Sequence, residues 1–118
     1  MKTFLQSVQY ALQGLRAAFD GRNFRIQLGL ASLVLAAGFY FSITRLEWCV
    51  LLFNMALVLS LEIVNSSLEN LVDLVTRERH PLAGKVKDLA AGAVIVASGL
   101  AIVMGVIVFW PYIAAGLR

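Results

Sequence analysis

A polar stripe follows an apolar run near the middle of this chain. The run Trp48–Leu61 is almost wholly apolar, and it continues without glycine or proline into a segment that carries three acids. Because an α-helix repeats every 3.6 residues, steps of three, four and seven residues return to one face. Glu62, Asn65, Glu69 and Asp73 obey this spacing and form one stripe. Acids in a row at one end of a membrane helix indicate a site for something cationic.

The acids of this stripe are suited to two different chemical roles. A carboxylate at the bilayer centre costs about 2.5–3.5 kcal/mol and usually marks function. Glu62, the deeper acid, can act as a general base toward a lipid hydroxyl, whereas Glu69 can hold Mg²⁺ together with substrate phosphates. Lys85 and Lys87, beside Asp88, can contact phosphate oxygens. A base, a metal and phosphate-binding cations are the groups that phosphoryl transfer to a lipid needs.

A structural role for these acids is the first alternative. In that case they only form ion pairs that cap a helical bundle at its cytoplasmic end. Their partners would be the basic residues of the following link, Arg77, Arg79, Lys85 and Lys87. The dipeptide His80-Pro81 predicts a turn, since the residue before a proline leaves the helical region. Phosphate contact by His80 is the functional alternative to a simple turn.

A non-enzymatic trimeric membrane scaffold or cation channel is the second alternative. A channel requires polar side chains along a continuous path through the bilayer. The outer halves of the three long apolar segments are apolar and offer no such path, which disfavours a channel.

Three long apolar segments must position this chemistry. Hydrophobic residues make up 60% of the 118 residues and charged residues only 14%, which excludes an ordinary soluble domain. About 20 apolar residues span a bilayer, so membrane helices are predicted at about 26–43, 46–75 and 86–110. An amphipathic helix at about 3–20 is expected in the membrane interface, or else packed on the bundle like a soluble helix. The whole chain, 1–118, is expected to be one all-α membrane domain.

Several common functional motifs are absent from the sequence. It contains no P-loop, no dinucleotide-binding fingerprint and no nucleophile elbow. One cysteine and one histidine are too few for a zinc site, and Cys49 cannot form an intrachain disulfide. The net charge of +3 is explained by membrane topology rather than by binding to nucleic acid. A kinase with this sequence belongs to no soluble kinase class.

The basic residues predict the orientation in the membrane. They concentrate in the N-terminal segment, which includes Lys2, and in the 76–87 link, and positive residues favour the cytoplasm. The N-terminus and the link are therefore expected inside, with the 44–47 turn and the C-terminus outside, although Arg118 is basic. At 1.5 Å per residue, Glu62 then lies roughly 24 Å from the outer surface, within a hydrocarbon layer of about 30 Å.

The motif residues resemble those of one known family. The run Glu62–Asp73 reads E-I-V-N-S-S-L-E-N-L-V-D, and His80–Val94 reads H-P-L-A-G-K-V-K-D-L-A-A-G-A-V. With Gly14–Phe19 and Arg22-Asn23, they are similar to the small prokaryotic diacylglycerol kinase and undecaprenol kinase family over nearly the whole chain. The resemblance implies an inner-membrane homotrimer whose subunits each have a surface helix and three transmembrane helices. It also implies transfer of the γ-phosphate of ATP, with Mg²⁺, to a lipid alcohol, undecaprenol or diacylglycerol.

The resemblance also assigns roles to individual residues. Glu62 is the implied catalytic base and Asn65 its neighbour in the site. Glu69 is the implied ligand of both metal and nucleotide. The other implied nucleotide contacts are Tyr10, Glu78, His80, Lys87 and Asp88.

One segment departs from the family's pattern. The family has a second metal-binding glutamate after the surface helix, whereas this chain reads Asp20-Gly21-Arg22-Asn23 there, one residue shorter and without glutamate. Asp20 is the candidate metal ligand in its place. The alternative is that Asp20 only ends the surface helix and pairs with Arg16 or Arg22.

Two short segments bear on the choice of substrate. The segments H-P-L-A and A-A-G-A-V resemble the undecaprenol kinase branch of the family more than the diacylglycerol kinase branch.

Overall fold

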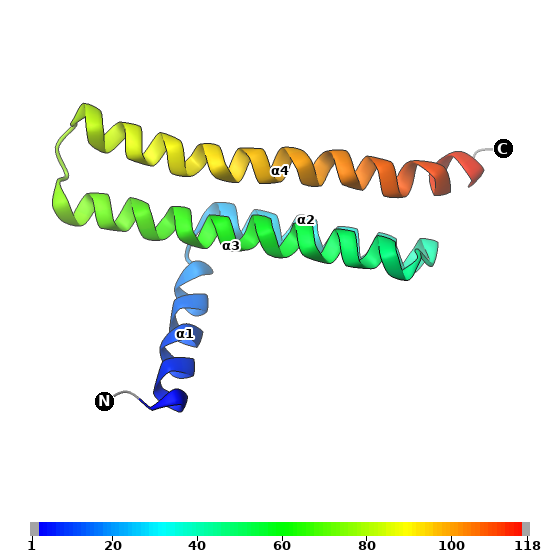
Figure 1. Ribbon diagram of the computed structural model, residues 1–118, viewed down its shortest axis with the longest axis horizontal. Helices are drawn as coiled ribbons and strands as arrows, with labels where there is room; N and C mark the ends of the chain where they lie inside the picture. Colours follow the sequence, from blue (N-terminus) through cyan, green and yellow to red (C-terminus); the bar gives the residue numbers. More distant parts are fainter. Residues whose placement is uncertain (1–2, 117–118) are drawn as a thin grey trace.

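The computed structural model describes residues 3–116, which form four helices (Figure 1). α1 spans Phe4–Ala18, α2 spans Arg22–Phe41, α3 spans Arg45–Val75 and α4 spans Pro81–Gly116. The predicted all-α class is confirmed, and three of the helices are long and apolar enough to cross a membrane. The basic residues Lys2 and Arg118, which bear on orientation, lie outside the described residues.

α1 begins with a capping box and projects away from the long helices, on the side of α3 opposite α4 (Figure 1). The Thr3 hydroxyl accepts a hydrogen bond from the backbone N–H of Gln6 at 3.2 Å, and the Gln6 side chain accepts one from the backbone N–H of Thr3 at 3.0 Å. The two bonds satisfy donors that a helix start leaves unpaired. No residue of α1 is buried, and its apolar Phe4, Leu12 and Leu15 are exposed. α1 thus touches α3 without burying its apolar side, which suits a membrane interface.

Short connections at both ends set the long helices antiparallel. Ser42 adopts the left-handed conformation, with a φ of 51°, and ends α2. Thr44 then starts α3 with a second capping box, which it forms with Glu47. At the other end, α4 begins at Pro81 rather than near residue 86, because proline suits the first position of a helix, where no N–H is needed.

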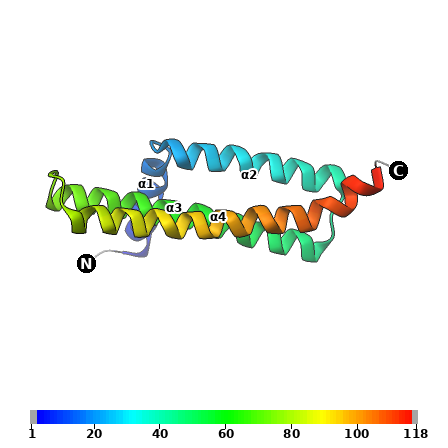
Figure 2. The same ribbon diagram turned by 90° about the horizontal axis from the view of Figure 1, so that it is seen from above.

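α2 and α4 both pack against α3, but from different directions: Figure 1 shows α4 beside α3 with α2 behind it, and Figure 2 shows α2 beside α3. The chain measures 57 × 40 × 20 Å, and three helices packed in this open way bury few side chains. Its core lies at the end opposite the α3–α4 loop, where Ile43, Leu51 and Val108 are buried. Large apolar side chains remain exposed along all three helices, and these are suited to lipid or to another copy of the chain.

Three side-chain contacts define the register between α3 and α4. Tyr112 donates a hydrogen bond to the Glu47 carboxylate, the Asn54 amide donates to the Met104 sulfur, and Lys87 donates to Asp73. The same register places Ala97 at the level of Glu62, and both residues are buried. The small side chain of Ala97 allows α4 to approach α3 closely at this level.

Gly38 of α2 is expected to tolerate no side chain, because it lies against the indole ring of Trp48. A Cβ atom added at Gly38 would come within 2.6 Å of the Trp48 ring and 3.2 Å of the Ile43 side chain. Overpacking of this kind typically costs about 1–3 kcal/mol. Gly38→Ala is therefore expected to lower the melting temperature of the detergent-solubilised protein, measured by circular dichroism.

Gly29→Ala, on the same helix, is the matched control for that substitution. A Cβ atom at Gly29 meets nothing within 4 Å, and alanine favours a helix over glycine. The control is therefore expected to keep or raise the melting temperature. Equal melting temperatures for the two variants would contradict the packing argument.

Candidate functional site

The polar stripe of α3 divides into a buried part and an exposed part. Glu62 and Asn65 are each only 5% exposed, whereas Glu69 and Asp73 are exposed. α3 runs through all four positions because the segment contains no glycine or proline. All four side chains therefore share a face, and packing of the neighbouring helices withdraws only the first two from the surface.

Gln27 of α2 joins the buried part of the stripe. Its side-chain amide donates a hydrogen bond to the Glu62 carboxylate, and the Asn65 amide donates another. Asn65 Nδ2 also lies 3.3 Å from Glu69 Oε1, and the carboxylates of Glu62 and Glu69 are close enough to repel each other. We call Gln27, Glu62, Asn65 and Glu69 the Glu62 network. Within it, two amides orient a carboxylate that is almost fully withdrawn from water.

Gln27 is not among the site residues predicted from the sequence. A signal was present, since Gln27 is a polar residue in an otherwise apolar membrane segment. The side chain that it meets depends on how α2 is rotated against α3, and the sequence pattern of α2 does not specify that rotation.

Two acceptor atoms of the Glu62 network have no partner within the described chain. They are Gln27 Oε1 and Asn65 Oδ1, and both are buried. A buried polar atom without a partner costs about 1–3 kcal/mol, so these oxygens are suited to a ligand hydroxyl, a water or a cation.

The oxygen donors of the Glu62 network can coordinate Mg²⁺ only if substrate phosphates and water complete the coordination shell. Residues 3–116 contain no group of three or more acidic, histidine or cysteine side chains able to hold a metal by themselves. Mg²⁺, however, usually takes one or two carboxylates and completes its shell with substrate phosphates and water. Glu69 and the unpartnered Asn65 oxygen meet that smaller requirement.

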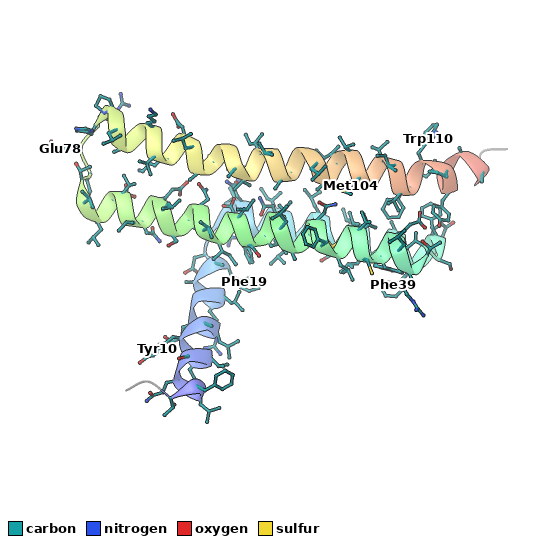
Figure 3. All side chains as sticks on the ribbon, viewed as in Figure 1. Tyr10, Phe19, Phe39, Glu78, Met104 and Trp110 are labelled. Atoms are coloured by element: carbon teal, nitrogen blue, oxygen red, sulfur yellow. The ribbon has the colours of Figure 1, made fainter. Side chains whose placement is uncertain are left out.

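A second group of predicted residues lines a hollow beside the α3–α4 loop, where Figure 3 labels Glu78. The hollow has a volume of about 460 Å³ and includes Glu78, His80 and Lys87.

Two residues of this hollow have defined polar partners. Lys87 Nζ lies 2.8 Å from Asp73 Oδ1, and this is the only ion pair among the described residues. Among the acids of the stripe, Asp73 is thus the one for which the described residues show the ion pair expected under the structural alternative. His80 Nδ1 accepts a hydrogen bond from the backbone N–H of Leu82 at 3.1 Å, which orients its ring at the start of α4.

Lys87 and Asp88 are adjacent in sequence but line different hollows. Asp88 lines a second hollow of about 450 Å³, together with Lys85 and Gly92. Neighbouring positions on a helix point in different directions, so adjacent residues do not share a face. One chain therefore does not bring Asp88 into the hollow that contains Lys87.

Tyr10 and Asp20 line neither of the two hollows at the start of α4. Tyr10 is on α1, well away from Glu78 at the α3–α4 loop (Figure 3). Asp20 is exposed in the turn between α1 and α2, and within residues 3–116 it forms no ion pair with Arg16 or Arg22. The pairing expected as the alternative role of Asp20 is therefore not observed.

Known proteins match this chain along most of its length. Residues 9–109 match the prokaryotic diacylglycerol kinase family. The chain is 35% identical over 112 residues to an undecaprenol kinase of Bacillus subtilis, covering 94% of this chain and 91% of the relative. It is also 35% identical over 108 residues to a diacylglycerol kinase of Haemophilus influenzae, covering 90% and 92%. A diacylglycerol kinase of Escherichia coli K12 is 29% identical over 109 residues, covering 92% and 89%.

The matched residues 9–109 include all of α2 and α3 and most of α4. A scaffold or a channel does not account for a kinase-family match over residues 9–109. The chain belongs to the prokaryotic diacylglycerol kinase and undecaprenol kinase family, a family of ATP-dependent lipid kinases.

Proposed function

We propose that this protein transfers the γ-phosphate of ATP to the hydroxyl of a membrane lipid alcohol, undecaprenol or diacylglycerol, with Glu62 as the general base. The observation that carries this proposal is the burial of the Glu62 carboxylate on a membrane helix, between amide donors from Gln27 and Asn65. Such a carboxylate is costly to keep in a membrane protein and usually marks function.

The chemical step follows from a carboxylate placed beside a lipid hydroxyl. Glu62 accepts the hydroxyl proton as the lipid oxygen attacks the γ-phosphorus of ATP. The bond between that phosphorus and the β–γ bridging oxygen breaks, and ADP leaves with the oxygen. Glu62 then releases the proton to water before the next turnover. Gln27 and Asn65 keep the carboxylate in one orientation throughout.

Glu69 is proposed to hold Mg²⁺ together with the phosphates of ATP. Its carboxylate and the Asn65 Oδ1 atom are hard oxygen donors of the kind that Mg²⁺ prefers. When bound, the ion would neutralise phosphate charge.

The hollow beside the α3–α4 loop is proposed to take the nucleotide. Lys87 supplies a positive charge for phosphate oxygens, and its exposed pair with Asp73 is weak enough to be exchanged for them. Glu78 and His80 line the same hollow, and Asp88 lies on the adjoining face of α4.

The proposed orientation places this chemistry at the cytoplasmic side of the inner membrane. α3 has 31 residues and α4 has 36, so they are about 46 and 54 Å long, more than the hydrocarbon layer of about 30 Å. The excess at the α3–α4 loop carries Glu69 and the basic link. With the N-terminus and this loop inside, the site opens toward cytoplasmic ATP, and the C-terminus lies outside.

A homotrimer is proposed as the working form. Within one chain, Tyr10 lies well away from the hollow that contains Glu78, so contact between Tyr10 and a nucleotide there requires α1 of a neighbouring copy (Figure 3). The exposed apolar side chains of the three long helices supply a surface for assembly. Chemical cross-linking in native membranes is expected to give a trimer, and a monomer alone would overturn this part of the proposal.

Phosphorylation assays with each lipid test the function and separate the two substrates. The Bacillus subtilis and Haemophilus influenzae relatives have the same identity to this chain and different substrate names, so identity does not choose between them. The H-P-L-A segment favours undecaprenol. Purified protein with excess labelled ATP is therefore expected to phosphorylate undecaprenol with the higher kcat/KM. Failure to phosphorylate either lipid would overturn the proposed function.

Asp20 is proposed to bind Mg²⁺ weakly, through a water molecule. Aspartate is one methylene shorter than glutamate, and Mg²⁺ readily keeps several waters in its octahedral shell. Asp20→Asn is therefore expected to raise the Mg²⁺ concentration needed for half-maximal activity several-fold, whereas Asp20→Glu is expected to match or improve on wild type. Superimposable Mg²⁺ titrations of wild type and Asp20→Asn would show that Glu69, the phosphates and water hold the metal without Asp20.

A further inference from the structure

The first turn of α4, beside the α3–α4 loop, is capped by the single histidine of the chain, His80 (Figure 1). The backbone N–H of Gly84 donates to the His80 carbonyl oxygen at 3.0 Å, and this is a hydrogen bond of the helical type. His80 therefore occupies the N-cap position, where a side-chain acceptor can pair with a free N–H of the first turn. Its Nδ1 atom does so, 3.1 Å from the backbone nitrogen of Leu82.

This hydrogen bond specifies the protonation state of the His80 ring. A backbone N–H can only donate, so Nδ1 must supply a lone pair and carry no proton. The neutral ring then has its proton on Nε2, whereas an imidazolium has protons on both nitrogens and accepts no hydrogen bond. Capping of α4 by His80 and protonation of Nδ1 therefore exclude each other.

The side-chain caps of α1 and α3 do not have this property. Thr3 and Thr44 accept the equivalent hydrogen bonds with hydroxyl oxygens, which do not change charge near neutral pH. Histidine is the side chain that commonly changes charge between about pH 5 and pH 8. Among these three side-chain caps of the described chain, the cap of α4 is thus the one that mild acid can remove.

The charges around His80 do not compensate for loss of the cap. Five charged side chains line the same hollow, namely Asp73 of α3, Arg77, Glu78 and Arg79 of the link, and Lys87 of α4. Asp73 is paired with Lys87, which leaves two arginines against one glutamate. Lys85 and Asp88, in the adjoining hollow, carry opposite charges. A positive charge at the start of a helix is also disfavoured by the helix dipole.

The first turn of α4 forms part of the hollow that is proposed to take the nucleotide. Pro81, Ala83 and Gly84 of this turn line the hollow together with His80. Without the cap, the N–H of Leu82 loses its partner, and an uncapped helix end opens more readily. Loss of the cap therefore disorders one side of the hollow.

We infer that His80 is a pH-sensitive cap, whose neutral ring holds the first turn of α4 in the arrangement that binds ATP and whose protonation releases that turn. The capping itself depends only on the hydrogen bond to Leu82. The effect on the nucleotide rests on the proposed function, because it takes the hollow as the ATP site. Its consequence is that acidification of the cytoplasm raises the ATP concentration that the protein needs.

Nitrogen-15 NMR of the detergent-solubilised protein tests the cap directly. The chain contains one histidine, so its imidazole signals identify themselves. At about pH 8 we expect Nδ1 without a proton and Nε2 with one, and at about pH 5 we expect protons on both. The hydrogen-exchange protection factor of the Leu82 amide is expected to fall about fivefold between these pH values, the size typical of a lost N-cap. A protonated Nδ1 at the higher pH, or an unchanged protection factor, would overturn the inference.

Three substitutions of His80 separate the cap from the charge. His80→Asn keeps a side-chain acceptor suited to an N-cap and does not titrate, His80→Lys carries a charge without an acceptor, and His80→Ala has neither. From about pH 8 to about pH 5, the KM for ATP of wild type is expected to rise about fivefold relative to that of His80→Asn. Comparison at each pH cancels the titration of ATP itself. The lysine and alanine variants are expected to have a higher KM than His80→Asn at both pH values.

Two kinetic results would contradict the role of the cap in nucleotide binding. One is the same pH dependence of the KM for ATP in wild type and in His80→Asn. The other is a lower KM in His80→Lys than in His80→Asn, which would show that a positive charge at this position matters more than the cap.

The NMR measurement also separates failure of this inference from failure of the proposed function, because it needs no phosphorylation. A cap that titrates as expected, in a protein that phosphorylates neither lipid, would disprove the kinase proposal alone. An active kinase whose Nδ1 carries a proton at about pH 8 would disprove the cap alone.

Discussion

Replacing Glu62 with glutamine is expected to lower kcat for lipid phosphorylation by about 10²–10⁴-fold while the helices remain folded. General-base catalysis typically contributes that much, and an amide cannot accept the hydroxyl proton. Glutamine has nearly the size of glutamate, so the packing around this buried position is preserved. The measurement is initial-rate kinetics in detergent or lipid at saturating ATP and lipid.

Glu47→Gln is the matched control for this prediction. It makes the same chemical change on the same helix, α3, but at the opposite end from the Glu62 network. Glu47 accepts hydrogen bonds from Tyr112 and from the backbone N–H of Thr44, so this variant is expected to lose some thermal stability and to keep its turnover per folded protein. Near-normal kcat in Glu62→Gln, with a fall in Glu47→Gln, would disprove the assignment of the base.

Glu69→Gln is expected to raise the apparent KM for ATP and the Mg²⁺ requirement by about 10–100-fold, with a smaller effect on the lipid KM. Loss of one oxygen ligand of a metal weakens the use of metal and nucleotide together, and changes around metal ligands typically cost this much. Glu69 lies two turns along α3 from Glu62 on the same face, and it is exposed where Glu62 is buried. Glu62 is thus expected to act on the lipid hydroxyl, and Glu69 on Mg²⁺ with ATP.

Titrations of ATP, Mg²⁺ and lipid on the same Glu69→Gln preparation check this division of roles. The hydrogen bond from Asn65 Nδ2 to Glu69 Oε1 can persist with the amide oxygen of glutamine as acceptor, so the Glu62 network is expected to keep its arrangement. A change confined to the lipid KM, with the same ATP and Mg²⁺ dependence as wild type, would rule out the metal role.

The sequence alone determined the helical class, the three apolar helices and the polar stripe of α3. These features depend on local properties, namely the length of apolar runs, the 3.6-residue period and the absence of glycine and proline between Glu62 and Asp73. The capping residues at Thr3 and Thr44 are also local, and each starts a helix where it occurs.

The burial of the stripe was decided by packing and not by its spacing. Glu62 and Asn65 are buried where α2 and α4 pack against α3, whereas Asp73 lies beyond α2 and pairs with Lys87 across the end of the α3–α4 hairpin. Periodicity places these side chains on one face but carries no information about which neighbouring helix covers each turn of it.

Only the tertiary structure decided which residues from different helices meet. Gln27 reaches Glu62, Lys87 and Asp88 line different hollows, and Tyr10 lies well away from Glu78 of its own chain. Each of these outcomes depends on the rotation and register of one helix against another, which the packing of side chains such as Ala97 controls. An apolar groove lined by α2, α3 and α4 arises in the same way, because α2 and α4 both pack on α3 and leave between them a space that the pattern of a single helix does not predict.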